Sequence, residues 1–256
     1  MIGVVGGGQL ARLLVEAGKK RNVDVVVQTG VTTDPAAKKA KEVILHDPTN
    51  AEGTKLLAEK TCSITFENEW IDIPSLLSLE NKGVSFLPNL QSIDPLINKI
   101  NQRELLNSLD IPCPEWIPIP LKKSSELDLP SHWGFPLMAK AAKGGYDGKG
   151  TKIIKNAKQL EEFLEVQKKQ QWMLEKWVSF DKELSIVSSR DSKGIVRSLP
   201  IVETYQSKQV CDWVLAPADI NHDVDLMVKN IVSSLLVELD YVGVIAIEFF
   251  YGSEGL

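Results

Sequence analysis

The stretch AKAAKGGYDGKGT at residues 139–151 places four glycines and three lysines between two segments typical of β-strands, 135–140 and 151–155. Glycine lets backbone N–H groups approach a ligand closely, and lysine supplies positive charge for phosphate oxygens. The stretch is not a Walker A loop, because Gly150 rather than Ser or Thr follows Lys149 and no helix comes next. It predicts a hairpin that covers a polyphosphate, and an ordinary glycine-rich turn is the simpler alternative.

The composition is that of a soluble globular protein, with 256 residues of which 43% are hydrophobic and 25% charged. A net charge of −5 argues against a nucleic-acid partner, which would need a clustered basic surface. No signal peptide is recognisable, and no apolar run approaches the roughly 20 residues that span a bilayer, so we expect no membrane partner. Three widely spaced cysteines suit reduced thiols and predict a cytoplasmic protein.

Alternating strand and helix patterns predict a doubly wound parallel α/β domain over residues 1–94. Its strands are expected at 2–5, 23–28, 43–45 and 63–66, with helices at 36–41 and 51–60. Leu10, Leu13, Leu14 and Ala17 recur at helical spacing and predict a further helix directly after the first strand.

The pattern changes after residue 94. An amphipathic helix over 96–109 and a proline-rich extended segment are expected to form a linker at 95–120. An antiparallel α+β arrangement then follows to the end of the chain. Its further strands are expected at 172–178, 183–189, 196–203 and 243–251, and its helices at 156–169 and 219–240.

The segment GGGQLA at 6–11 fits the Gly-x-Gly-x-x-Ala fingerprint of a dinucleotide-binding turn. That fingerprint expects an acidic residue at the end of the second strand, where this sequence has Gln28 and Thr29. We therefore interpret the turn as an anion pocket for a substrate. The alternative is a nicotinamide oxidoreductase, and tight binding of NADH would support that hypothesis.

Three glutamates lie in apolar surroundings, where an ionised carboxylate needs donors, a cation or a metal. A purine ring with ribose hydroxyls would supply an apolar face and hydrogen-bond donors for Glu175 and Glu183. Mg²⁺ beside substrate phosphates would explain Glu248. The alternative for all three is a solvent-facing position on a strand edge.

Several motifs in order resemble the ATP-grasp enzymes: the glycine turn, Lys99, the glycine-rich hairpin, EKWV at 175–178, KELS at 182–185 and the acidic final strand. Within that superfamily, GGGQLAR at 6–12, TFENE at 65–69, GGYDGKG at 144–150 and YVGV at 241–244 resemble the N5-carboxyaminoimidazole ribonucleotide synthetase family. The resemblance covers essentially the whole chain. It implies an N-terminal pre-ATP-grasp domain, a lid domain at 121–179 and a partial catalytic subdomain at 180–256.

The resemblance also implies a reaction, in which ATP phosphorylates bicarbonate and the resulting carboxyphosphate delivers CO₂ to 5-aminoimidazole ribonucleotide. The residues implied to bind ATP are Lys99, Lys140, Gly145, Tyr146, Asp147, Gly148, Lys149, Gly150, Thr151, Glu175, Lys176, Trp177, Val178, Glu183 and Gln206. Glu248 would hold Mg²⁺. The ribonucleotide would meet Gly8, Gln9, Leu10 and Glu67, and the implied catalytic residues are Lys140, Tyr146, Asp147 and Lys149.

The sequence departs from this family in two ways. Gln206 stands where members commonly have a histidine, and the chain stops before the family's second metal-binding strand. We therefore expect a shortened product of a normal enzyme that binds nucleotide weakly and turns over poorly. The resemblance further suggests a homodimer formed through the first domain.

Two alternative hypotheses for the function remain open. Another ATP-grasp ligase, such as a relative of formate-dependent purine transformylase or biotin carboxylase, would share Lys140, Glu183 and Glu248. A non-catalytic nucleotide-binding protein would bind ATP without any effect of aminoimidazole ribonucleotide.

Overall fold

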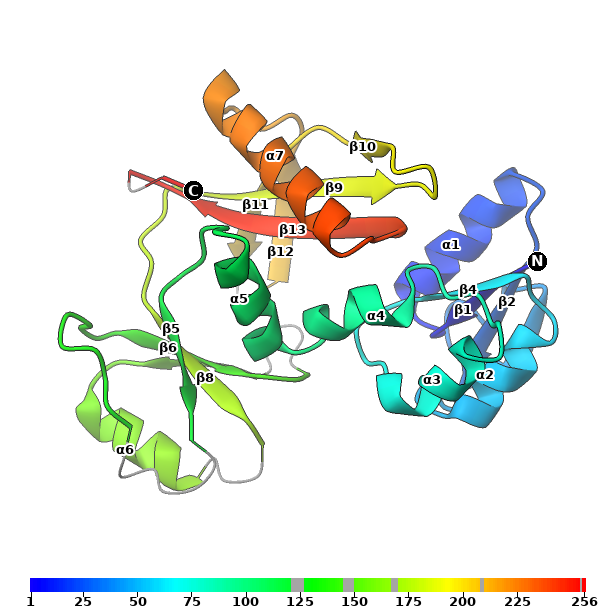
Figure 1. Ribbon diagram of the computed structural model, residues 1–256, viewed down its shortest axis with the longest axis horizontal. Coiled ribbons are helices and arrows are strands. Elements are labelled where there is room, and N and C mark those ends of the chain that lie inside the picture. Colours follow the sequence, from blue (N-terminus) through cyan, green and yellow to red (C-terminus); the bar gives the residue numbers. More distant parts are fainter. Residues whose placement is uncertain (121–126, 145–149, 167–169, 208–209, 254) are drawn as a thin grey trace. The chain divides into compact units, whose positions relative to one another are not determined.

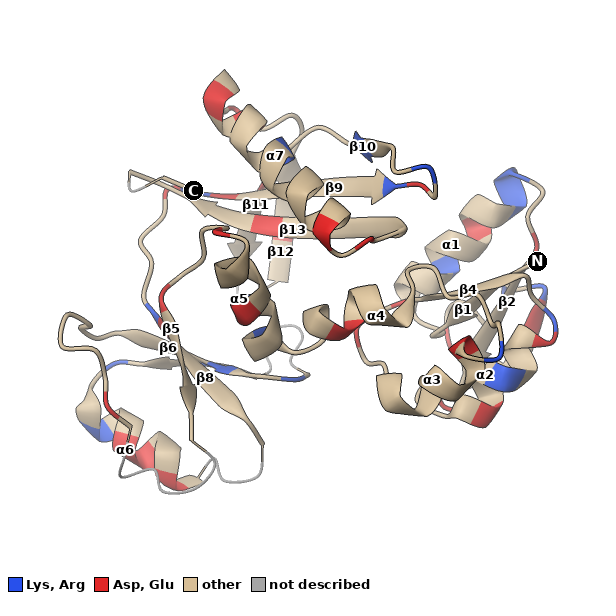
Figure 2. Cartoon of the chain, in the orientation of Figure 1, with Lys and Arg blue, Asp and Glu red and all other residues tan. Residues whose placement is uncertain are grey.

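The computed structural model describes residues 1–120, 127–144, 150–166, 170–207, 210–253 and 255–256. These residues form two compact units, Met1–Ile97 with Leu239–Gly243, and Asn98–Glu238 with Val244–Leu256 (Figure 1). Acidic and basic residues are interspersed over both units (Figure 2). Among the described residues, the helices are all too short or too polar to cross a membrane.

The first unit is built on a parallel sheet in the order β3-β2-β1-β4. Its strands are β1 (Ile2–Val5), β2 (Val25–Thr29), β3 (Glu42–Leu45) and β4 (Ser63–Phe66). The chain leaves β1 for β2 on one side and later returns to β4 on the other, so the strand order reverses beside β1. In such sheets, ligands bind at the carboxyl ends of the strands where the order reverses.

The helices of the first unit are α1 (Gln9–Lys20), α2 (Ala51–Ala58), α3 (Ile73–Glu80) and α4 (Leu90–Ile93), followed by the 3₁₀ turn η1 (Asp94–Leu96). Helix α1 buries Ala11 and Val15 against the sheet, whereas Leu10, Leu13 and Leu14 are exposed. The helix expected at 36–41 is wrong, because this segment forms turns. The backbone bonds outside a helical pattern at both ends of this segment, because the Ala36 N–H donates to the Gly7 carbonyl and the Lys41 N–H to the Val25 carbonyl.

A buried amide ties β2 to α2. The Gln28 side chain is fully buried, and its Nε2 donates to the Asp47 carbonyl at 2.7 Å and to the Asn50 carbonyl at 3.0 Å. Its Oε1 accepts a hydrogen bond from Thr54 Oγ1 at 2.9 Å. Asn50 is also the N-cap of α2 and accepts from the backbone N–H groups of Glu52 and Gly53. Gln28 therefore has a structural role at the place where a dinucleotide site would carry an acid.

The second unit begins with α5 (Lys99–Ser108) and an antiparallel sheet in the order β5-β8-β6-β7, which we call the hairpin sheet. Its strands are β5 (Trp116–Ile119), β6 (Leu137–Ala141), β7 (Thr151–Ile154) and β8 (Trp172–Lys176). The side chains of α6 (Ala157–Val166) pack on one face, and Ile100 of α5 packs on the other against Ala142 and Met173. The proline-rich segment thus contains strand β5, where Pro118 is tolerated because β5 is an edge strand.

The second sheet of this unit, the C-terminal sheet, has the order β10-β9-β11-β12, with β13 also paired to β9. Its elements are β9 (Lys182–Arg190), β10 (Val196–Ser198), β11 (Val202–Ser207), β12 (Val210–Leu215), α7 (His222–Glu238) and β13 (Gly243–Tyr251). The single strand expected at 196–203 is wrong, since residues 199–201, with Pro200 at their centre, separate β10 from β11. Strand β12 was not expected, and all of its residues are exposed, so no burial pattern marks it.

The Gln28 network predicts a cost of mutation in the first unit. Gln28→Leu leaves two carbonyls and one hydroxyl without their partner in a buried site, so we expect the free energy of unfolding to fall by about 2–4 kcal/mol. Urea unfolding followed by circular dichroism measures this change. The matched control is Gln91→Leu, at an exposed position of α4. Equal stabilities of the two variants would show that the network contributes nothing.

Candidate active site

The glycine turn after β1 meets a carboxylate that follows β4. Strands β1 and β4 are neighbours, with Val5 paired to Phe66, so residue 67 emerges beside the turn. Glu67 Oε2 accepts from the Gly8 N–H at 2.8 Å, and Oε1 accepts from the N–H groups of Leu10 and Ala11 at 3.1 and 3.2 Å. The amides that the sequence assigned to a substrate anion are thus bound to Glu67, which caps the N-terminus of α1.

The three consecutive glycines leave no room for side chains. A Cβ at Gly6 would lie 2.5 Å from the Cβ of Glu67, and one at Gly8 would lie 2.6 Å from Glu67 Oε1. A Cβ at Gly7 would lie 2.6 Å from the Thr29 side chain. Gly6 also has a φ of 127°, which side chains disfavour. The turn therefore fits closely around Glu67, while Gln9 and Leu10 expose their side chains at the start of α1.

The hairpin sheet holds a buried carboxylate between two cations. Along β8, Trp172 and Leu174 face the α6 side, so by strand alternation Met173 and Glu175 face α5. The Glu175 side chain is only 3% exposed. Its Oε2 lies 2.5 Å from Lys140 Nζ on the adjacent strand β6, and its Oε1 accepts from Arg103 Nε at 2.8 Å.

These contacts correct the sequence-based interpretation of Glu175. The carboxylate is not on a solvated strand edge, and its partners are two cations of the chain, not a ligand. Arg103 was not predicted from the sequence. Its signal was the spacing of four residues from Lys99, which places both cations on one face of a helix.

Five residues of the predicted flap, Gly145, Tyr146, Asp147, Gly148 and Lys149, lie outside the described residues. The residues that flank them are ordered by backbone contacts. Ala141 N–H donates to the Gly150 carbonyl at 2.8 Å, and Thr151 pairs with Lys140 across the two strands. Lys99 Nζ lies 3.4 Å from the Gly144 carbonyl. The structure thus brings Lys99, Lys140, Gly150 and Thr151 to the end of the hairpin sheet from which the flap leaves.

Lys176, the last residue of β8, is held by a surface carboxylate. Lys176 Nζ bonds to Glu115 Oε1 at 2.6 Å, and His132 and Trp133 bond to Glu115 Oε2. These hydrogen bonds, that from Lys176 first, lower the pKa of the Glu115 carboxyl to about 2. The Lys176 side chain is thereby turned to Glu115. Beyond it, Trp177 is exposed and Val178 half-buried.

Three residues predicted for nucleotide or metal binding meet on the C-terminal sheet, on β9, β11 and β13. Burial raises the pKa of the Glu183 carboxyl, the negative charge of Glu248 raises it further, and a hydrogen bond from Gln206 opposes the shift. Glu248 lies on the exposed face of β13. Within the described ranges, groups of three or more His, Cys, Asp or Glu side chains suited to a metal are absent. Two oxygen-donor carboxylates nevertheless suit Mg²⁺, which takes further ligands from water and phosphates.

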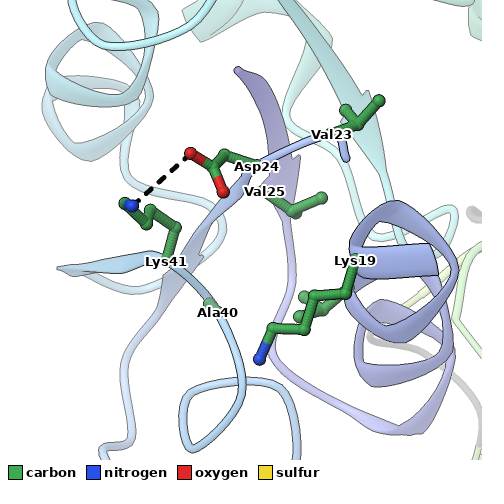
Figure 3. Close-up of a pocket in the computed structure, with 7 residues that line it drawn as sticks. Lys19, Val23, Asp24, Val25, Ala40 and Lys41 are labelled. Carbon is green, nitrogen blue, oxygen red and sulfur yellow. Dashed lines mark ion pairs between the residues drawn. The ribbon is translucent and has the colours of Figure 1, made fainter. Parts of the chain in front are cut away.

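A separate pocket of about 340 Å³ lies in the first unit and contains none of the predicted site residues. It is lined by Val15, Lys19, Val23, Asp24, Val25, Ala40 and Lys41 (Figure 3). Lys41 pairs with Asp24 at 3.5 Å across an exposed edge. The pocket lies at the amino end of β2, opposite to the strand ends where ligands bind in such sheets.

Comparison with known proteins connects both units to one family. The ATP-grasp domain profile matches residues 104–256, and the ribonucleotide synthetase preATP-grasp domain profile matches residues 1–95. N5-carboxyaminoimidazole ribonucleotide synthase of Synechococcus elongatus is 37% identical over 255 residues, which are 100% of this chain and 64% of the relative. The enzyme of the same name from Synechocystis is 39% identical, over 97% of this chain and 62% of the relative.

A solved structure shows the same fold. The crystal structure of N5-carboxyaminoimidazole synthase from Aspergillus clavatus, in complex with ADP and 5-aminoimidazole ribonucleotide, matches with a TM-score of 0.89 and 27% identity. The match covers 100% of this chain and 67% of that one. The chain spans less than two thirds of the length of the two Synechococcus and Synechocystis relatives. Since the ATP-grasp profile covers more than half of its residues, the chain belongs to the ATP-grasp family.

Proposed function

We propose that the chain provides the nucleotide- and substrate-binding part of an enzyme that carboxylates 5-aminoimidazole ribonucleotide in purine biosynthesis. ATP would phosphorylate bicarbonate, and the carboxyphosphate would carboxylate the amino group of the ribonucleotide. The observation that carries the proposal is the 37% identity to a relative named N5-carboxyaminoimidazole ribonucleotide synthase, over 100% of this chain and 64% of the relative. The geometry of both units is compatible with it.

The nucleotide would bind to the second unit. Lys140 and Lys99 supply positive charge at the end of the hairpin sheet, where the phosphates of ATP would lie. The backbone of 175–178 would meet the adenine edge, and Glu183 with Gln206 would bind the ribose. Tyr146, Asp147 and Lys149 lie outside the described residues, and we propose them as further ligand-binding residues of this enzyme. Negative charge that shifts between phosphate oxygens during transfer would then meet fixed donors.

Mg²⁺ would be held by Glu248, with Glu183 as the neighbouring carboxylate. The repulsion between the two carboxylates supports this assignment, because a divalent cation would relieve it. When bound, Mg²⁺ offsets the negative charge of the phosphates and orients them. Gln206 keeps a hydrogen-bonding amide at this site and adds no charge of its own.

The aminoimidazole ribonucleotide would bind to the first unit, at the turn formed by Gly8, Gln9 and Leu10. Three backbone donors hold the Glu67 carboxylate in one orientation at the carboxyl end of the sheet. An oriented carboxylate is a good acceptor for ribose hydroxyls. Glu67 would thus bind the substrate through its own carboxylate, and the backbone N–H groups would remain bound to Glu67.

We further propose a homodimer formed through the first unit, in the cytoplasm. Leu10, Leu13 and Leu14 form an exposed apolar strip on α1, and a partner subunit would cover it. Light scattering of the purified chain measures the assembly state.

The cytoplasmic location is proposed from the cysteines. Cys62, Cys113 and Cys211 are free thiols, which suit a reducing compartment.

The proposal is tested by titrating the chain with MgADP and with 5-aminoimidazole ribonucleotide, and by incubation with ATP, the ribonucleotide and ¹³C-bicarbonate. We expect both ligands to bind and a carbamate carbon to appear only slowly in the NMR spectrum, in line with the poor turnover expected from the sequence. Binding of MgADP without any binding of the ribonucleotide would indicate a non-catalytic nucleotide-binding protein. Carboxylation of a different acceptor would indicate another ATP-grasp ligase.

The cation at residue 140 gives a direct prediction for nucleotide binding. Lys140→Met removes a charge from the phosphate site, so we expect MgADP to bind about tenfold or more weakly, as measured by calorimetry. Lys155→Met, at an exposed position after β7, is the control and should bind as the unsubstituted chain does. Lys140→Arg keeps the charge and should recover part of the affinity. Equal affinities for all variants would remove Lys140 from the site.

The raised pKa of Glu183 gives a prediction for stability. The folded chain keeps the Glu183 proton to a higher pH than the unfolded chain, so this residue lowers the free energy of unfolding as the pH rises from about 4 through the raised value. Glu183→Gln should remove that decrease and leave the variant more stable near neutral pH. Urea unfolding over this pH range measures it, with the exposed Glu162→Gln as control. Parallel profiles for both variants would contradict the assignment.

A further inference from the structure

The carboxylate of Glu175 divides its two oxygens between two cations. Oε2 lies 2.5 Å from Lys140 Nζ, while Oε1 accepts from Arg103 Nε and lies 2.8 Å from the Arg103 Nη2 atom. The side chains of Arg103 and Lys140 are 16% and 19% exposed, so water screens these contacts little. The cluster therefore acts as one buried electrostatic unit.

Arg103 reaches this cluster because α5 is fixed to the hairpin sheet. Asn98 caps the helix, and the Lys99 N–H donates to the Ala142 carbonyl at 2.8 Å. Ile100 is buried beside Met173 of β8. Arg103 lies four residues after Lys99, on the same face of the helix. The backbone and the apolar contacts thus set the distance from Arg103 to β8.

The charges of the cluster do not cancel. One carboxylate faces two cations, and arginine stays protonated at any pH at which proteins fold. Without Arg103, both oxygens of the buried carboxylate would turn to the single remaining cation and neutralise it. With Arg103, Lys140 meets one oxygen, and its ammonium group keeps donors for another acceptor.

We infer that Arg103 is a positioning residue for the nucleotide phosphates. By holding one oxygen of Glu175, it fixes the carboxylate that orients Lys140, and it leaves a net positive charge for phosphate oxygens. This inference rests on the proposed function, in which Lys140 binds the phosphates. Arg103 itself acts through Glu175 and does not touch the nucleotide.

The experiment has a readout that needs no nucleotide. Acetylation of Lys140 by acetic anhydride is followed by peptide mass spectrometry, with exposed Lys155 of the same molecules as the reference. In Arg103→Met the ammonium of Lys140 is held by both carboxylate oxygens, so we expect acetylation at least about threefold slower than in the unsubstituted chain. Arg103→Lys restores a cation and should restore most of the rate. An unchanged or faster reaction in Arg103→Met overturns the inference.

The second readout is the affinity for MgADP, measured by calorimetry. We expect a loss of about tenfold in Arg103→Met and recovery in Arg103→Lys. Arg21→Met removes one positive charge from an exposed position of the first unit and should leave the affinity unchanged. If Arg103 had a merely structural role, Arg103→Met would lower the melting temperature but leave the affinity of the folded chain for MgADP intact. That result also overturns the inference.

The two readouts separate this inference from the proposed function. If the unsubstituted chain does not bind MgADP, the proposed function fails, and the acetylation rates still decide whether Arg103 orients Lys140. If MgADP binds but its affinity is indifferent to Arg103, the proposed function stands and the inference fails.

Discussion

A carboxylate that loses contact with water needs hydrogen-bond donors or cations, and each unit of this chain contains one that has them: the half-buried Glu67 in the first unit and the buried Glu175 in the second. In the first unit, Glu67 takes three backbone N–H groups at the start of α1. In the second unit, Glu175 takes the charged groups of Arg103 and Lys140. Both carboxylates join segments that are distant in sequence, and neither can be removed without leaving its partners unmatched.

The two solutions have different electrostatic results. Amide donors carry only partial charge, so Glu67 keeps most of its negative charge at the end of the first sheet. Two cations exceed the charge of one carboxylate, so the cluster of Arg103, Glu175 and Lys140 keeps a net positive charge. One ATP-grasp chain thus offers an acceptor in one unit and an excess of positive charge in the other, which suits a sugar hydroxyl and a phosphate respectively.

Local sequence patterns were sufficient for much of the fold. The strands β1, β4 and β13 were predicted with their observed bounds, because each is a short apolar or alternating run between turn residues. Strand β12 escaped prediction because neither of its faces is buried. The turns at 36–41 were mistaken for a helix, since composition alone does not show that the N–H groups of Ala36 and Lys41 bond to distant carbonyls of the sheet domain.

The candidate site was only partly predictable, because the roles of its carboxylates depend on partners from other elements. The sequence indicates that Glu175 needs a counter-charge, but only the packing of α5 on β8 identifies Arg103. It also indicates that the glycine turn offers donors, but only the adjacency of β1 and β4 shows that Glu67 takes them. Strand alternation predicts that Glu248 shares a face of β13 with Val244 and Ala246, but only the structure shows that this face is exposed. Contacts between residues close in sequence can be predicted from local patterns, whereas contacts between neighbouring strands and helices cannot.

The triple glycine turn has a consequence for how this protein can change during evolution. Because a methyl group at Gly6 or Gly8 would overlap Glu67, and one at Gly7 would overlap Thr29, these positions cannot drift independently of their neighbours. A lineage that replaces the carboxylate at position 67 relieves the contact at Gly8 but not those at Gly6 and Gly7, whereas a lineage that alters the loop displaces the carboxylate. The chemistry of the first unit and the shape of its backbone are therefore inherited together.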